Sequence, residues 1–339
     1  MAAASSTKID IEISEVGTRD GLQSIDTIMP TEAKKAWIAA EAAAGVPEIE
    51  VGSFVPAKVL PQLADTAELV AFARTIEGLN VAVLVPNLKG AQAALKAGAH
   101  KMAIPFSVSE THSLRNVKRT HEQMFEAVAQ IAAEIRALPA AERPVFEVGL
   151  STAFGCTLEG AIPEDQVIRI AERVIELGAD EVGLSDTTGY GNPAQLKRLA
   201  QGIWRAVGRE RLDGVHLHNT RGQGLANVMA ALELGMKTID ASLGGIGGCP
   251  FAPGASGNIV TEDLVFLLEA MGLNTGIDID ALLACRAQVQ AALPGEAMYG
   301  FTPDAGLPKD FRYAREQRAG KPLPAGRGAE PTDSQRAAS

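Results

Sequence analysis

Residues 214–243 read GVHLHNTRGQGLANVMAALELGMKTIDASL and contain the pattern that decides the fold. The run 214–218 is short, with apolar residues at alternate positions, which is typical of a strand. The segment 224–234 has a helical pattern, Gly235 follows it, and 238–243 is a second strand-like run. Glycine tolerates the left-handed conformation that ends a helix. The stretch therefore predicts a strand, a helix and a further strand.

The same alternation recurs along the chain. Strands are predicted at 9–16, 48–53, 81–86, 101–106, 145–151, 181–185, 214–218 and 238–243. Helices between them are predicted at 31–44, 88–97, 121–137, 164–177, 193–207 and 224–234. Strand followed by helix, eight times without a break, is the pattern of a parallel (β/α)8 TIM barrel. A doubly wound sheet is the alternative, and the unbroken alternation favours the closed barrel.

The segments outside the barrel have a different character. A Gly-rich loop at 244–257 precedes predicted helices at 261–271 and 280–292, and 294–311 is predicted to be irregular. From about residue 317 the chain is rich in Gly, Pro, Arg and Ser, a composition that cannot bury a core. We therefore expect an N-terminal stub at 1–8, a catalytic barrel domain at 9–312 and a disordered tail at 313–339.

Composition excludes several classes of function. The 339 residues carry a formal net charge of -10, which argues against a nucleic-acid groove and against an anionic membrane surface. No apolar run approaches the roughly 20 residues of a membrane span, and no secretory leader is recognisable. Cys156, Cys249 and Cys285 are odd in number and far apart, so no disulfide framework is expected. The sequence predicts a soluble, cytoplasmic protein.

Polar residues gather where the predicted strands end. An enzyme with this barrel has its active site at the carboxyl ends of the strands. The polar residues expected there are Arg19, Asp20, Glu50, Ser151, Asp186, Thr187, His216, His218, Asn219, Cys249 and Asn258. Taken alone, Asp20 could belong to a plain turn, Asp186 could cap a helix, and the histidines could have a structural role. Their convergence at one end of the barrel favours a site.

Residues His216 and His218 suit a divalent metal. Their spacing places both imidazoles on one face of a strand, and Asp20 can add an anionic oxygen. Asn258 could add a neutral oxygen, and this donor set allows Mg, Mn, Co or Zn. Cys249, in the Gly-rich loop, is interpreted as a mobile acid or nucleophile, with a small buried hydrophobe as the alternative. The loop lacks the ending of a P-loop, so nucleoside triphosphate binding is not expected.

Six motifs carry a resemblance to a known family. They are EVGTRDGLQS, IEVGSFVPAKVLPQLAD, LVPNLKG, LSDTTGYGNP, HLHNTRGQGLANVMAALELG and GGIGGCPFAPGASGNIVTEDLVFLLEAMG. In this order, from about residue 9 to residue 280, the chain resembles the 3-hydroxy-3-methylglutaryl-CoA lyase family of metallolyase TIM barrels. That superfamily also contains isopropylmalate and homocitrate synthases.

The resemblance implies a reaction and a set of roles. The expected reaction is retro-Claisen cleavage of 3-hydroxy-3-methylglutaryl-CoA, or a close tertiary 3-hydroxyacyl-CoA, to acetyl-CoA and a keto acid such as acetoacetate. Citramalyl-CoA lyase or a Claisen-type synthase is the alternative, and leucine degradation is the implied pathway. A homodimer or higher homo-oligomer and a Mg²⁺ or Mn²⁺ ion are also implied. The roles implied are metal ligation by Asp20, His216, His218 and Asn258, and catalysis by Arg19, Cys249, Glu50 and Asp186.

Chemistry explains these residue types. Arg19 keeps its proton and could stabilise the thioester enolate. Asp186 could be the base or could orient His216 as the base, and Cys249 could protonate the enolate carbon. The family pattern H-x-H-D-T-Y-G-Q reads HLHNTRGQ here, and its L-G-C-P-Y-E-G reads FGCTLEG. The changed positions lie near where the tail of the substrate would sit, and Ser151, Thr187, Asn219 and Arg221 are expected to bind the substrate.

Overall fold

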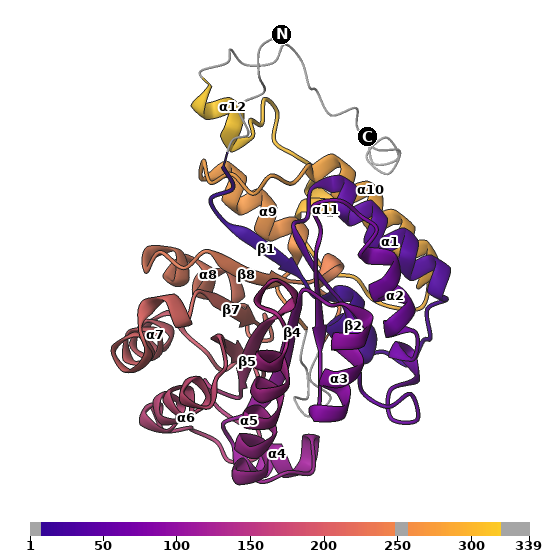
Figure 1. The fold of residues 1–339 in the computed structure, drawn as a ribbon. Coiled ribbons are helices and arrows are strands. Elements are labelled where there is room, and N and C mark those ends of the chain that lie inside the picture. The colour runs from indigo at the N-terminus through magenta and orange to yellow at the C-terminus, as the bar shows by residue number, and fades with distance from the viewer. Residues whose placement is uncertain (1–7, 248–256, 320–339) are drawn as a thin grey trace.

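Eight parallel strands form a closed barrel in chain order (Figure 1). The computed structural model describes residues 8–247 and 257–319. The strands are β1 (Glu12–Glu15), β2 (Glu48–Ser53), β3 (Asn80–Leu84), β4 (Lys101–Ser107), β5 (Val145–Ser151), β6 (Glu181–Asp186), β7 (Gly214–Leu217) and β8 (Thr238–Ala241). Strand β1 pairs with both β2 and β8, which closes the sheet. The predicted (β/α)8 barrel is confirmed, and the doubly wound sheet is excluded.

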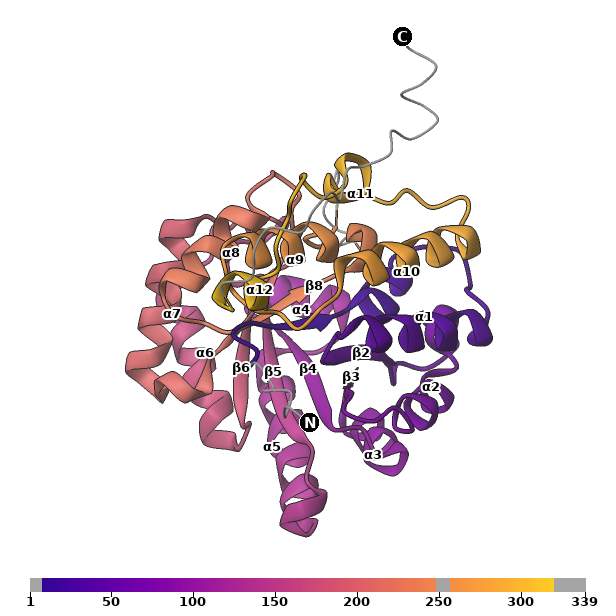
Figure 2. The same ribbon diagram turned by 90° about the horizontal axis from the view of Figure 1, so that it is seen from above.

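Helices surround the barrel (Figure 2). The longer ones are α1 (Thr31–Ala44), α2 (Thr66–Ala73), α3 (Leu88–Ala97), α4 (Glu110–Asn116), α5 (His121–Ala137), α6 (Glu164–Leu177), α7 (Pro193–Val207), α8 (Gly224–Glu233), α9 (Thr261–Ala270) and α10 (Ile279–Ala292). The short ones are η1 (Gly17–Gly21), η2 (Pro61–Leu63), η3 (Ala140–Glu142), η4 (Arg209–Arg211), η5 (Leu243–Gly245), α11 (Thr302–Ala305) and α12 (Ala314–Arg318). Helices α1, α3, α5, α6 and α7 have the predicted bounds. Helices α2 and α4 were not predicted, because eight and seven residues give too little periodicity.

Alternation along the strands separates the core from the barrel interior. Outward-facing residues such as Ile13, Val148 and Leu217 are fully buried against the helices. The inward-facing positions carry polar or small residues instead, and they line an open cavity: Ser14, Glu48, Glu50, Ala82, Lys101, Ala103, Glu147, Gly149, Ser151, Ser185, His216 and Asp240. A (β/α)8 barrel ordinarily fills its interior with bulky branched side chains. This barrel therefore keeps space along its axis.

A helix from the C-terminal part of the chain packs against the first helix of the barrel. Helix α10 lies beside α1 in both views (Figures 1 and 2). Gly45 ends α1 with φ 102°, and a Cβ there would lie 2.4 Å from the carbonyl oxygen of Gly276. The N–H of Asp278 donates to the carbonyl of Ala44 at 2.8 Å. Only glycine satisfies both the backbone conformation and this close approach.

The expected start of the tail at residue 313 was wrong. Tyr313 is buried, and its hydroxyl accepts a hydrogen bond from the N–H of Ile279 at 2.9 Å. The N–H of Ala314 donates to Glu269, and α12 follows. One buried aromatic side chain thus anchors 313–318 to the barrel domain, a contact that low overall hydrophobicity concealed. Residues 320–339 lie outside the described part of the chain.

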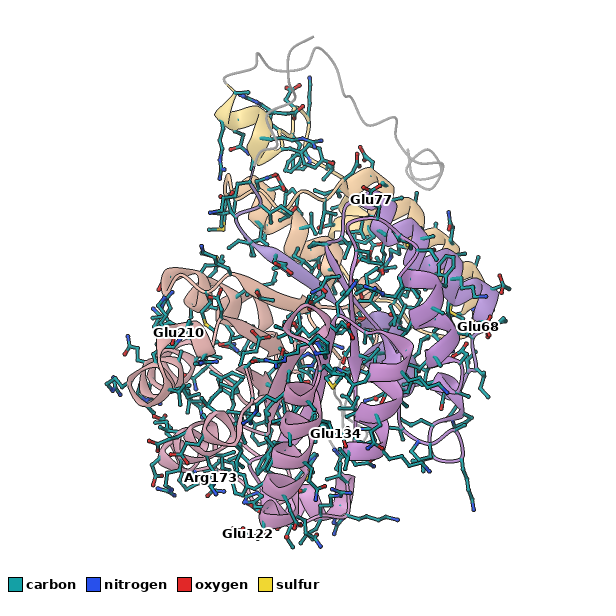
Figure 3. All side chains as sticks on the ribbon, in the orientation of Figure 1. Glu68, Glu77, Glu122, Glu134, Arg173 and Glu210 are labelled. Carbon is teal, nitrogen blue, oxygen red and sulfur yellow. The ribbon has the colours of Figure 1, made fainter. Side chains whose placement is uncertain are left out.

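Charged side chains cover the outer helices. Figure 3 labels Glu68 on α2, Glu122 on α5 and Arg173 on α6, all at the periphery of the molecule. Arg173 pairs with Glu176 at 3.0 Å, one helical turn away. Within residues 8–247 and 257–319, none of the helices is long and apolar enough to cross a membrane.

Candidate metal centre and active-site cavity

The end of β1 turns Arg19 and Asp20 into the barrel mouth. Residues Gly17–Gly21 form a single π-helical turn, η1, and not the plain turn that was the alternative to a site at Asp20. The N–H groups of Arg19 and Asp20 donate to the carbonyl of Val16 at 3.1 and 2.7 Å. Single π-helical turns often occur at functional sites because they redirect side chains. The turn places two consecutive charged residues at one point of the cavity wall.

Asp20, His216 and His218 converge on one point. The two histidines alternate along the end of β7, so both rings enter the barrel. Their Nε2 atoms are 3.1 Å apart, and Asp20 Oδ2 lies 4.0 Å from His216 Nε2 and 3.8 Å from His218 Nε2. The three possible ligand atoms lie within 4.8 Å of one another.

These residues fit a divalent cation. Ligand atoms about 2.1 Å from a shared ion lie roughly 3.0–3.5 Å apart, close to the separations above. Two imidazole nitrogens that face each other cannot both keep a proton, whereas both can face a cation. Asn258 Oδ1 is buried and has no hydrogen-bond partner within the described residues. A buried carbonyl oxygen without a donor is costly unless a cation or a water satisfies it.

Asn258 lies against the same carboxylate. Its amide nitrogen donates to Asp20 Oδ2 at 2.8 Å, so its oxygen faces away from that carboxylate. Rotation of the amide about its last bond would exchange the two atoms. The structure thus brings Asn258 to the site but presents the nitrogen, and ligation would use the rotated amide.

Arg19 connects Asp20 with Glu50. Its Nε donates to Glu50 Oε2 at 2.5 Å, and a terminal nitrogen donates to Asp20 Oδ1 at 2.5 Å. Burial raises the pKa of Glu50 to about 7, although Arg19 lowers it in part. Burial also opposes ionisation of Asp20, but Arg19 and the two imidazoles outweigh it and hold the pKa of that carboxyl well below its usual value. Asp20 is therefore anionic and Arg19 cationic at neutral pH.

Asp240, not Asp186, contacts His216. Asp240 Oδ2 lies 3.1 Å from His216 Nδ1, because the two residues are opposite each other in the β7–β8 register. Asp186 instead accepts the backbone N–H groups of Tyr190 and Gly191. Burial raises the pKa of Asp186 to about 6. One of the two roles considered for Asp186, orientation of His216, is thus placed with Asp240, which was not among the predicted site residues.

Asp20, His216 and His218, which we call the metal-binding group because they could hold an ion, open into a cavity of about 520 Å³. Its wall includes Arg19, Glu50, Ser151 and Thr187 beside the histidines. Ser151 ends β5, and Thr187, just after β6, accepts the N–H of Thr152 on its hydroxyl at 2.9 Å. Thr152 has φ 58°, an uncommon value for a residue other than glycine. Two of the four residues expected to bind the substrate, Ser151 and Thr187, therefore line the cavity.

Asn219 and Arg221 have other contacts. The side chain of Asn219 accepts the N–H of Gly224 at 3.0 Å, at the start of α8. Arg221 donates to the carbonyl of Thr188 at 3.0 Å and stacks 4.5 Å from the ring centre of Tyr190. Neither residue belongs to the cavity wall. Both side chains stabilise the loops around the mouth. The structure places neither of them where it could contact an acyl substituent directly.

Cys249 lies outside the described residues, as do positions 248–256 of its loop. Both flanks of that loop reach the metal-binding group. The N–H of Asn258 donates to the carbonyl of Gly247 at 2.9 Å, and Ser242 pairs with Ile259. The role of Cys249 stays a prediction.

The (β/α)8 fold and the polar residues at the mouth of the barrel place this chain in the class of (β/α)8-barrel enzymes. A family model described as HMGL-like matches residues 10–289. The chain belongs to the HMGL-like family. It is 38% identical over 273 residues to the cytoplasmic 3-hydroxy-3-methylglutaryl-CoA lyase of Rattus norvegicus, covering 80% of this chain and 78% of the relative. It is 36% identical over 280 residues to hydroxymethylglutaryl-CoA lyase YngG of Bacillus subtilis, covering 83% and 92%.

Solved structures agree with this assignment. An HMG-CoA lyase from Acinetobacter baumannii, in complex with coenzyme A and 3-methylmalate, superposes with a TM-score of 0.82 at 40% identity and covers 89% of this chain and 97% of that chain. The hydroxymethylglutaryl-CoA lyase of Pseudomonas aeruginosa gives a TM-score of 0.81 at 35% identity, with 87% and 97% covered.

Proposed function

We propose that this protein is a divalent-metal-dependent carbon–carbon lyase that cleaves 3-hydroxy-3-methylglutaryl-CoA, or a close tertiary 3-hydroxyacyl-CoA, to acetyl-CoA and a keto acid. The observation that carries the proposal is the convergence of Asp20, His216 and His218 beside the Arg19–Glu50 pair. The similarity to lyases over four fifths of the chain supports the reaction type. Asp20, His216, His218 and Asn258 would hold Mg²⁺ or Mn²⁺, which would supply Lewis acidity toward the substrate hydroxyl.

The residues around the proposed metal site have different roles in the reaction. The C2–C3 bond of the acyl group breaks, the hydroxyl loses its proton, and the departing thioester enolate gains a proton on carbon. Arg19 keeps its proton and can donate hydrogen bonds to the enolate oxygen. Glu50 faces the cavity with a pKa of about 7, which suits a group that accepts a proton near neutral pH. We assign the base to Glu50, which lines the cavity, rather than to Asp186, which does not and whose two oxygens both accept backbone N–H groups.

We propose that the coenzyme A portion leaves through the cavity mouth. Lys118 and Arg119 belong to the wall there, after α4, and in the described part of the chain neither forms an ion pair. Lys118 has φ 57°, an uncommon backbone conformation for lysine. Cations without a carboxylate partner at the mouth of an acidic protein suit the phosphates of coenzyme A. The complex of the Acinetobacter baumannii relative with coenzyme A supports an acyl-CoA ligand.

A direct assay tests the reaction. The purified protein with Mg²⁺ or Mn²⁺ is incubated with 3-hydroxy-3-methylglutaryl-CoA and citramalyl-CoA, and the keto acid is identified by mass spectrometry. We expect acetyl-CoA and acetoacetate from the first substrate, and loss of activity with a chelator or with His218→Ala. Condensation of acetyl-CoA with a keto acid, without cleavage, would identify a synthase instead. The cytoplasmic location and the homo-oligomer stay predictions.

A further inference from the structure

The cavity continues past the metal-binding group into the barrel. Beside His216, its wall includes Ala82, Ala103, Gly149 and Ser185, one small residue on each of β3, β4, β5 and β6. We call the space that these four residues surround the inner chamber. Bulky residues at such positions would fill it, as in most barrels of this class. The small residues leave it open.

Gly149 shows how open the inner chamber is. A Cβ at this position would have no neighbour closer than 4.0 Å, and those neighbours are Ile104 O and Ser185 Oγ. The φ of Gly149 is not in the left-handed region, so its backbone does not require glycine. Neither strain nor close packing explains a glycine here. The space itself is the consequence of the missing side chain.

The floor of the inner chamber is rich in carboxylates. Lys101 Nζ lies 2.7 Å from Glu147, 2.9 Å from Glu181 and 3.8 Å from Glu48. Asp240 also belongs to the cavity wall. One ammonium pairs with three carboxylates here, so a further carboxylate that entered would meet net repulsion. An uncharged group would not meet it.

The positions of the metal-binding group and of the cavity mouth limit the direction in which the acyl group of the substrate can extend. The acyl group has to reach Asp20, His216 and His218, while coenzyme A is too large to enter and stays at the mouth. C3 of this substrate also carries a carboxymethyl arm, which the acidic floor repels, so the alkyl substituent on C3 is the group that can extend inward. We infer that the inner chamber receives an uncharged C3 substituent larger than methyl, and that Gly149 determines the accepted size. This inference rests on the proposed lyase function and specifies its substrate class.

The test compares substrates and variants. The Mg²⁺-loaded wild type, Gly149→Ala and Gly149→Leu are assayed with 3-hydroxy-3-methylglutaryl-CoA and its 3-ethyl and 3-propyl homologues. We expect the wild type to cleave the longer homologues with kcat/KM within about threefold of the methyl substrate. Gly149→Leu should lose about tenfold or more on the propyl substrate, in the range that one or two methylenes are worth, and keep the methyl substrate. Gly149→Ala, the matched control, should retain all three.

Folding and function are separated by additional measurements. Circular dichroism and thermal melting check each variant, and Ala103→Leu fills the inner chamber from the adjacent strand if Gly149→Leu does not fold. The wild type could strongly prefer the methyl substrate, with the same preference in the filled variants. That result would overturn the inference but not the proposed lyase function. If no acyl-CoA is cleaved, the proposed function fails, and calorimetric binding of 2-methyl-, 2-ethyl- and 2-propyl-2-hydroxysuccinate to the Mn²⁺-loaded proteins decides the inference. Affinity that falls with chain length equally in wild type and Gly149→Leu would refute it, and a loss confined to the variant would support it.

Discussion

At the scale of single residues, His216 is held from two sides. Its Nε2 faces His218, and its Nδ1 lies 3.1 Å from Asp240. A carboxylate on the second nitrogen of a metal-binding histidine fixes the tautomer and makes the first nitrogen a better ligand. We therefore infer that Asp240 positions His216 for metal binding.

Replacement of Asp240 should weaken metal binding. We expect Asp240→Asn to raise the Kd for Mn²⁺ by about tenfold or more, because outer partners of ligating histidines are worth that much. Calorimetry on the metal-free protein measures the change. Asp186→Asn is the comparison, since Asp186 accepts backbone N–H groups instead, and its loss of affinity should be smaller. The reverse order would return the orientation of His216 to Asp186.

Cys249 can be tested although it lies outside the described residues. A serine keeps the size of the side chain but is a far weaker acid than a thiol, so Cys249→Ser should slow enolate protonation. We expect turnover to fall by about a hundredfold or more, the scale of general acid catalysis, with Mn²⁺ affinity unchanged. Steady-state kinetics and calorimetry give the two values. Equal turnover in the variant would remove Cys249 from the mechanism.

At the scale of elements, η1 depends on Gly17. A Cβ at this residue would lie 2.6 Å from Glu15 Oε1 and 2.8 Å from a ring carbon of Trp37. Both neighbours are buried, so neither can move aside easily. The π-helical turn that presents Arg19 and Asp20 can form only because this position has no side chain.

Gly17→Ala should therefore destabilise the protein and disturb the site together. Overpacking of a buried position costs about 1–3 kcal/mol, and the displaced turn should also weaken Mn²⁺ binding. Urea denaturation and calorimetry measure the two effects. Gly295→Ala is the control, because a Cβ there has no neighbour within 4 Å. An unchanged metal affinity in Gly17→Ala would show that η1 does not depend on this contact.

At the scale of the whole molecule, local patterns predicted the barrel well. Alternation along a strand, as at Ile13 and Ser14, and helical periodicity, as in α6, are written into consecutive residues. The contact of His216 with Asp240 depends on how β7 and β8 pair, which the sequence does not display. The loop contacts of Asn219 and Arg221 could not be predicted for a similar reason. Arg221 contacts the loop that follows β6, and Asn219 contacts the first residue of α8 across a turn.

The closed fold also buries three carboxyls between β1, α1 and α9. Glu15, Glu41 and Glu262 are fully buried. Burial raises the pKa of Glu15 to about 8 from its usual value near 4.5. Burial, together with the charge of Glu15, raises the pKa of Glu41 well above its usual value, and burial raises that of Glu262. The folded chain thus holds protons that the unfolded chain releases above about pH 4.5.

The sign of the pH dependence follows from this difference. Between about pH 5 and pH 8 the folded state binds more protons than the unfolded state, so the free energy of unfolding should fall as the pH rises. We expect a decrease of at least about 1 kcal/mol across this range, since one pKa unit corresponds to about 1.4 kcal/mol. Glu41→Gln keeps the shape of the side chain without an ionisable group, and should make the dependence shallower and the protein more stable at pH 8. Urea denaturation at pH 5, 6, 7 and 8 measures both.

The comparison that isolates burial is Glu77→Gln. Glu77 is exposed after α2, at the surface labelled in Figure 3. The same chemical change there removes a charge that water already solvates, so the pH dependence should match the wild type. If Glu41→Gln and Glu77→Gln behave alike, the buried carboxyls do not set the pH dependence. If only Glu41→Gln flattens it, the carboxyls between β1, α1 and α9 hold protons at neutral pH and set the pH dependence.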